Sequence, residues 1–176
     1  IQDSFYVKRP DASNIIDSIQ VGTSLTGGIY SYPFNTNGAG NNWSRSLYLS
    51  QMLGNTNRSV TICGLSYVTS YNYSHTRYHS QCYLKVTNTS LIGTSDSYVD
   101  PINDGATLVY KGTWTTKNGW NQFIFDTPFV LPQGYNLLVY WVDTSSLNQC
   151  NNSSTVYWAY NQTSSLGANY NAVDRH

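Results

Sequence analysis

The chain has 176 residues, the size of one ordinary domain, and its nine acidic and nine basic side chains give a net charge of zero. Charged residues make up only 10% of the chain and form no basic run, which argues against a nucleic-acid partner and against an anionic membrane surface. No apolar run approaches the roughly 20 residues of a membrane-spanning helix, so no membrane insertion is expected. The acidic residues are all Asp, and 16 residues are Tyr; lack of the helix former Glu and abundance of Tyr predict an all-β protein.

The chain opens with IQDSFYV, in which Ile1, Phe5 and Val7 alternate with the polar even positions and Asp3 is the exception. This period of two is typical of a strand with one buried face, and two cations and a proline at 8–10 end it. A strand cannot satisfy its backbone hydrogen bonds alone, so this segment must join a sheet.

Further short apolar or alternating runs follow at regular spacing, separated by turns rich in Gly, Pro and Asn. They span residues 14–22, 28–34, 43–53, 58–70, 80–88, 106–114, 120–129, 135–143 and 154–162. About ten short strands at this spacing predict an antiparallel β-sandwich or barrel, and only SRSLYLSQML (44–53) could hold a turn or two of helix. We expect one sandwich domain over 14–176, preceded by an extension strand and connector over 1–13.

Residues 118–141, NGWNQFIFDTPFVLPQGYNLLVYW, resemble a segment of a family of secreted bacterial β-sandwich modules from surface and exported proteins of Gram-negative polysaccharide degraders. Other stretches fall in that family's order: VGTS (21–24), YPF (32–34), SRSLYLSQMLG (44–54), VTICGLSYV (60–68), LKVTNTS (84–90) and VYKGT (109–113). The resemblance implies a jelly-roll-like sandwich. It says little of function, because such modules serve as binding, spacer and adhesin units.

The same segment carries its own physical pattern. Trp120, Phe123 and Phe125 are expected to fill the core along one strand, and Pro128 to end ladder pairing. The run NLLVYWV (136–142) is apolar almost throughout, which predicts a central strand covered on both faces.

No set of residues suited to catalysis stands out, and we expect neither an enzyme nor a bound metal or cofactor. Without Glu, an acid–base pair would need two Asp, and Asp100 and Asp104 lie in a predicted turn where Asp bonds its own backbone. Asp100, Asn103 and Asp104 could alternatively hold Ca²⁺, although the full EF-hand spacing is missing. The histidines His75, His79 and His176 show no metal-ligand pattern on a helix, and no G-x-S-x-G elbow occurs.

Three cysteines, Cys63, Cys82 and Cys150, leave two alternatives open. Cys63 and Cys82 lie in phase with apolar neighbours, as buried free thiols would. A secreted protein could instead carry one disulfide and one odd thiol, and the sequence does not determine the pairing.

The stretch SYNYSHTRYHS (70–80) is predicted to join two strands as a loop. Tyrosine-rich loops give contact area at low entropy cost, so this loop is a candidate sugar-binding site. Its aromatic residues are Tyr71, Tyr73 and Tyr78, with His75, Arg77 and His79 as polar neighbours and Trp43 or Trp158 as further candidates. The alternative is that the tyrosines simply cover the end of the sandwich.

Seven N-x-S/T sequons are candidate glycosylation sites: Asn42, Asn57, Asn72, Asn88, Asn151, Asn152 and Asn161. Covalent glycans would help to keep a nearly uncharged surface soluble. They indicate an extracellular protein, secreted or at the cell surface.

Two functions follow from these features. In the first, the N-terminal strand inserts into a neighbouring copy, with Ile1, Phe5 and Val7 as anchors, and the protein is a structural subunit of a glycosylated extracellular fibril. In the second, the strand pairs within its own sandwich and the protein is a monomeric carbohydrate-binding or adhesin module. We favour the fibril subunit, whose partners are copies of itself and covalent glycans.

Overall fold

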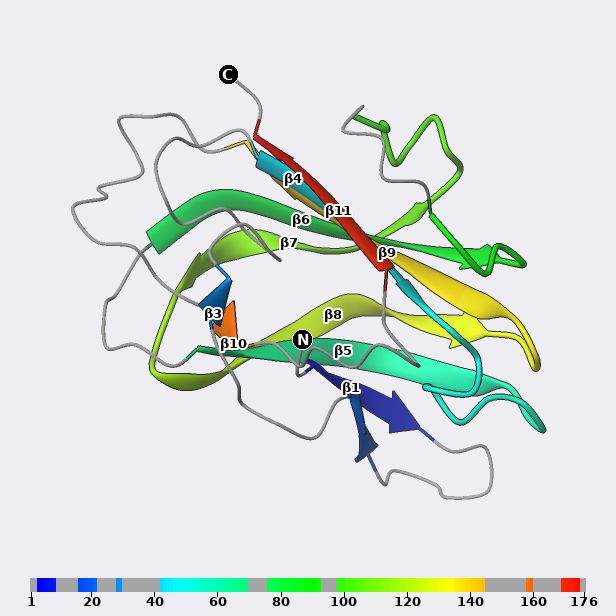
Figure 1. Cartoon of the computed structure of the whole chain (residues 1–176). Coiled ribbons are helices and arrows are strands. Elements are labelled where there is room, and N and C mark those ends of the chain that lie inside the picture. Colours follow the sequence, from blue (N-terminus) through cyan, green and yellow to red (C-terminus); the bar gives the residue numbers. More distant parts are fainter. Residues whose placement is uncertain are drawn as a thin grey trace.

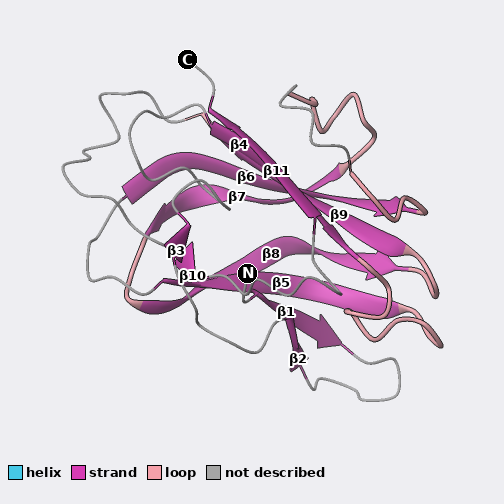
Figure 2. Cartoon of the chain, in the orientation of Figure 1, coloured by secondary structure: helices cyan, strands magenta, loops and turns pink. Residues whose placement is uncertain are grey.

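The computed structural model describes residues 3–8, 16–21, 28–29, 42–69, 76–92, 98–144, 158–159 and 169–174. None of these residues is helical, and the described strands form two antiparallel sheets that lie face to face (Figures 1 and 2). The prediction of an all-β antiparallel sandwich is therefore confirmed.

The first sheet contains β1 (Asp3–Lys8), β2 (Ile16–Val21), β3 (Gly28–Ile29), β5 (Val60–Thr69), β8 (Gly119–Leu131) and β10 (Trp158–Ala159). Its hydrogen-bonded order is β2-β1-β5-β10-β3, and β8 pairs with β5 as well. The strand β8 pairs with β5 along one edge, over residues 60–69 of β5. Along the other edge, β1 pairs with residues 61–67 and β10 pairs only with Thr69.

The second sheet contains β4 (Asn42–Tyr48), β6 (Thr76–Thr87), β7 (Thr107–Thr115), β9 (Asn136–Asp143) and β11 (Asn169–Asp174), in the order β11-β4-β9-β6-β7. The strand β11 was not predicted from the sequence. The segment 43–53 forms no helix: β4 ends at Tyr48 and a turn follows, in which the Met52 amide donates to the Leu49 carbonyl at 2.8 Å.

The core lies between the sheets and takes every second side chain of the facing strands. Phe123 and Phe125 of β8 are buried there, as predicted. Trp120 is 38% exposed, so the prediction that it fills the core is wrong. It is an odd number of residues from both phenylalanines and therefore projects from the opposite face of the strand.

Pro128 lies within β8 rather than at its end, but pairing does break around it. The ladder between β5 and β8 skips from Ile62↔Phe129 to Gly64↔Ile124. Since proline has no amide hydrogen to donate, the unpaired stretch 125–128 is a place where it costs no ladder bond.

The strand β9 is buried on both faces, as its sequence predicts. Leu137, Val139 and Trp141 face the core between the sheets. The alternate side chains, such as Tyr140, belong to a second cluster that also includes Trp43 and is packed by the covering segment 88–92 and 98–106.

Candidate functional site

The N-terminal strand β1 lies inside the sheet of its own chain. It pairs antiparallel with β2, for example Phe5↔Ile19, and antiparallel with β5, for example Phe5↔Leu65. Of the two arrangements that the sequence left open, the single chain therefore has the internal one. The segment set apart as an extension over 1–13 contributes an inner strand to the sandwich.

Two apolar side chains anchor β1 in the core. Phe5 is 0% exposed and Val7 is 2% exposed, and the Phe5 ring meets the Tyr48 ring edge-on with centroids 4.8 Å apart. Both belong to the main hydrophobic cluster. Ile1, the third predicted anchor, lies outside the described residues.

The outer face of β1 fits a notch in β5. A Cβ atom at Gly64 would lie 2.6 Å from the Phe123 carbonyl oxygen and 3.3 Å from the Tyr6 ring, so no larger residue fits without a shift. The Tyr6 hydroxyl donates to the Ser66 Oγ at 3.3 Å.

A bulge fixes the register of β1 along β5. Tyr6 faces Gly64 and the next residue, Val7, faces Ile62, so Cys63 is the extra residue of the bulge. Sliding by one residue would turn Phe5 and Val7 out of the core, which makes this register strongly specified.

Of the seven sequons, three lie on described residues. Asn57, in a bend before β5, and Asn88, directly after β6, are exposed, so an attached glycan would project into solvent. Asn42 is 2% exposed within β4, so a glycan there would have no room, and the prediction that Asn42 is glycosylated is wrong. The others, Asn72, Asn151, Asn152 and Asn161, lie outside the described residues.

The tyrosine-rich stretch is only partly a loop, because β6 begins at Thr76. Tyr78 is 43% exposed on that strand. Arg77 is 1% exposed and forms a 3.3 Å ion pair with the buried Asp143, so it cannot hold a ligand hydroxyl as proposed.

The remaining candidates for the same site are scattered. Trp43 is buried in the second cluster and is unavailable for stacking on a sugar. Tyr71, Tyr73 and His75 lie outside the described residues, as does the side chain of Trp158. His79 lies on β6, exposed, rather than in a loop.

The turn at 100–105 is a structural element of the covering segment. The Asp100 carboxylate accepts the Ile102 amide at 2.8 Å, the expected role of Asp in a turn. Asp104 pairs with the Lys85 ammonium at 2.8 Å and accepts a short hydrogen bond from the Tyr140 hydroxyl. Its oxygens thus face a cation and a donor, which does not favour the Ca²⁺ alternative.

These contacts shift the pKa values of both partners. Burial alone would raise the pKa of Asp104, but the hydrogen bonds from Lys85 and Tyr140 outweigh it and hold the pKa below its usual 3.8. Burial first, and then the bond to the Asp104 carboxylate, raise the pKa of the Tyr140 phenol.

Cys63 and Cys82 are buried and free, as one of the two alternatives predicts. Burial raises the pKa of the Cys82 thiol well above its usual value, which keeps it protonated. Cys150 and His176 lie outside the described residues. Within the described ranges, no three His, Cys or Asp side chains gather in a way that could hold a metal ion.

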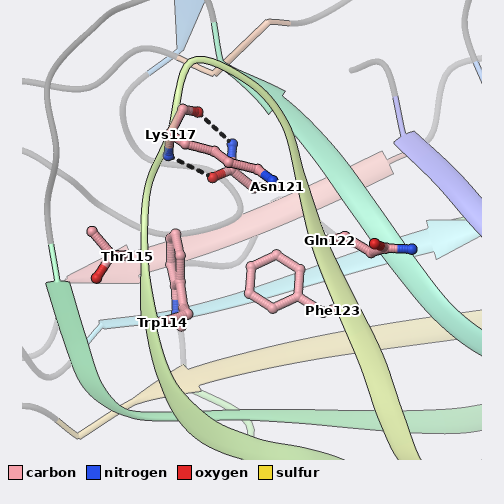
Figure 3. A pocket seen from close by; sticks show the side chains of 6 residues that line it. All are labelled: Trp114, Thr115, Lys117, Asn121, Gln122 and Phe123. Carbon is pink, nitrogen blue, oxygen red and sulfur yellow. Dashed lines mark hydrogen bonds between the residues drawn. The ribbon is translucent and has the colours of Figure 1, made fainter.

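A pocket opens where β7 turns into β8 (Figure 3). Its volume is about 240 Å³, and it is lined by Trp114, Thr115, Lys117, Asn121, Gln122 and Phe123. Sequence patterns did not identify this site. Its lining residues lie on β7, on β8 and in the turn between them, and the two strands belong to different sheets.

The search for relatives gave no match: no family model, no curated protein and no solved structure is similar to this chain. In the described part of the chain, no helix is long and apolar enough to cross a membrane. The candidate sites therefore stand on their geometry alone.

Proposed function

We propose that this protein is a structural subunit of an extracellular, glycosylated fibril and not an enzyme, and that β1 of one copy fills the place between β2 and β5 of the next. One observation carries the proposal: β1 is an inner strand that pairs with β2 and β5 along its two edges, and yet it precedes every other described strand in chain order. Another copy can supply such a strand without any change in how the other described strands are connected to one another.

The strand order supports this proposal. An eight-stranded jelly roll, the finer fold that we propose here, places its last strand between the first and the third. The orders β2-β1-β5-β8 and β4-β9-β6-β7 match that plan, with β2 as the first strand and β5 as the third. In this chain the place of the last strand is taken by the N-terminal β1. The place between β2 and β5 is thus filled by a strand that does not follow β9 in the sequence.

Insertion from a neighbour would reproduce the contacts described for the single chain. Phe5 and Val7 would enter the same core, and the same backbone pairs would form with both flanking strands. Such a contact joins unlike surfaces of the two copies, so repetition yields a filament unless the rotation closes a ring. The β1 strand of the same chain has the advantage of being covalently linked to the sheet, which gives it a high effective concentration. Insertion of β1 from a neighbouring copy is therefore favoured only where subunits are highly concentrated.

The glycan part of the proposal rests on the exposed sequons. Asn57 and Asn88 are exposed outside the strands, where modification would not disturb the described core. Glycans there imply an extracellular location, which is part of the same proposal.

A cross-linking experiment separates exchange from self-pairing. Lys8 faces Thr61 across the β1–β5 ladder, and the double variant Lys8→Cys/Thr61→Cys in a Cys150→Ser background can form a disulfide there. The protein is concentrated, filaments are verified by electron microscopy, and the sample is oxidised and run on a non-reducing denaturing gel. We expect a ladder of covalent multimers.

The matched control shares one of the two positions. Thr61 also faces Val130 of β8, which is exposed, so Thr61→Cys/Val130→Cys should link only within one chain and run as a monomer. Monomer bands from both variants in verified filaments would overturn strand exchange. Failure of the unmodified protein to form filaments at any concentration would overturn the fibril itself.

A further inference from the structure

We infer that Asp17 and Asp126 keep outer strands of the two sheets from pairing with other chains, and so direct strand addition to the place between β2 and β5. This inference rests on the proposed function, because it names residues that restrict exchange to one place in the sandwich. Both carboxylates do this by accepting a backbone amide that an added strand would otherwise use.

Outer strands are a hazard for a subunit that assembles by adding a strand. Among the described strands, β2 pairs only with β1, β8 only with β5, and β7 only with β6. Free N–H and C=O groups along such strands are a template on which any extended chain can pair. Assembly at one defined place therefore requires that these strands be protected.

On β2 the protection comes from the same strand. The Ser18 amide donates to the Asp17 Oδ1 at 2.8 Å. Ser18 is exposed and pairs with Tyr6 in the middle of the β1–β2 ladder. Since an Asp side chain competes with strand pairing when it bonds a neighbouring amide, the carboxylate occupies a donor that an added strand would need.

On β7 the protecting carboxylate comes from the other sheet. The Lys111 amide, in the middle of β7, donates to the Asp126 Oδ2 of β8 at 3.3 Å. This bond connects outer strands of the two sheets on the side of the sandwich where β7 leads into β8 (Figure 1). Lys111 is itself exposed, and a lysine on an outer strand is a common obstacle to pairing with a second chain.

The strand β8 is interrupted where it carries Asp126. Residues 125–128 leave the ladder with β5, and Pro128 has no amide hydrogen to donate. On either side of this stretch, Ile124 is 55% exposed and Val130 is 59% exposed. A regular β8 would offer both apolar side chains to a second chain, so the interruption protects the strand with the largest apolar exposure.

The place between β2 and β5 offers a different balance. A strand added there gains backbone pairs along both edges and buries the side chains of Phe5 and Val7. A strand added to β2 or β7 would gain pairs along one edge only, and it would first displace a carboxylate from a backbone amide. Both differences favour addition beside β5.

Two matched double variants test the inference. Asp17→Ala/Asp126→Ala removes both acceptors, whereas Asp17→Asn/Asp126→Asn keeps an amide oxygen at each position. Both remove two negative charges, so a difference between them is not an effect of net charge. The single variant Asp126→Ala, which changes an exposed residue, keeps the test valid if the double Ala variant fails to fold.

The first measurement is amide hydrogen exchange by NMR in dilute monomer. With both acceptors removed, the Ser18 and Lys111 amides should exchange at least about fivefold faster than in the native protein, because their hydrogen bonds are lost. In the Asn variant they should stay within about twofold of the native rates.

The second measurement is assembly at high concentration, followed by electron microscopy and sedimentation. We expect single filaments from the native protein and the Asn variant, and laterally joined bundles from the Ala variant. Single filaments of native width from the Ala variant would overturn the inference and leave the fibril in place. Self-association of the Ala variant without filaments of the native protein would support protection of the outer strands and overturn the fibril instead.

Discussion

The strands β1 and β9 occupy the same kind of place, each between two antiparallel neighbours inside its sheet, but they differ in what holds them there. The strand β9 is buried on both faces, and its chain continues into the fold at its N-terminal side. The strand β1 buries one face, through Phe5 and Val7, and it comes before all the other described strands in chain order.

Because of this difference, we expect β9 to stay in its own chain and β1 to be exchangeable between copies. Removing β9 would dismantle two hydrophobic clusters and the centre of a sheet, so β9 must fold with its own chain. Removing β1 would open one slot in one cluster, which a second copy of the same strand can fill. The four predictions below, from the largest expected effect to the smallest, test how far the two strands differ.

The largest effect is expected for Trp141→Ala on β9. It should lower the free energy of unfolding by about 4 kcal/mol, because a large buried side chain is deleted from the core. The variant also loses the 2.8 Å hydrogen bond from the indole to the buried Tyr67 hydroxyl. Denaturant unfolding measures the loss, and adding a peptide of residues 136–143 should restore none of it.

Phe5→Ala on β1 should lower the free energy of unfolding by about 3 kcal/mol, since the ring is fully buried against Tyr48. Excess native peptide of residues 1–8 should restore part of it, because it can occupy the slot in place of the altered strand. The same peptide carrying Phe5→Ala is the control. Lack of rescue by the native peptide would mean that β1 is as permanent as β9.

Asp104→Asn tests the cover over the outer face of β9. We expect a loss of about 1 kcal/mol at pH 7, because the ion pair to Lys85 and the charged acceptor of the Tyr140 hydroxyl disappear. Since the folded pKa of Asp104 is lowered, its stabilisation is present above the unfolded value near 3.8 and is lost as pH falls through the folded pKa. Unfolding curves at pH 7 and pH 2 should therefore differ less for the variant than for the native protein.

The smallest effect is expected for Tyr6→Phe on the outer face of β1. Loss of the 3.3 Å hydrogen bond to the Ser66 Oγ should cost about 0.5 kcal/mol and leave peptide rescue intact. A cost several times larger would show that the hydrogen bond to Ser66, and not the core anchors alone, holds the strand. Thermal unfolding of the variant beside the native protein distinguishes the two.

The alternation of apolar and polar residues predicted much of the fold, because the two-residue period of a strand depends only on neighbouring residues. The alternation in IQDSFYV identified Phe5 and Val7 as the buried face, and the apolar run 136–142 identified a strand covered on both sides. The same parity would have placed Trp120 on the exposed face, since it is out of phase with Phe123. By contrast, β11 has a weak pattern and is a strand only because β4 offers it an edge.

The candidate sites depended more on distant contacts. The burial of Arg77 and Asn42 beside β9, and the pocket beside Trp114, arise from strands that are far apart in sequence and meet in space, which no window of sequence contains. Composition and periodicity alone determined an all-β chain with one-sided and two-sided strands, because those properties are set by each residue and its near neighbours. Only the tertiary structure decided which strands are neighbours, that β1 lies between β2 and β5, and which polar side chains reach solvent, because these follow from pairing over long sequence separations.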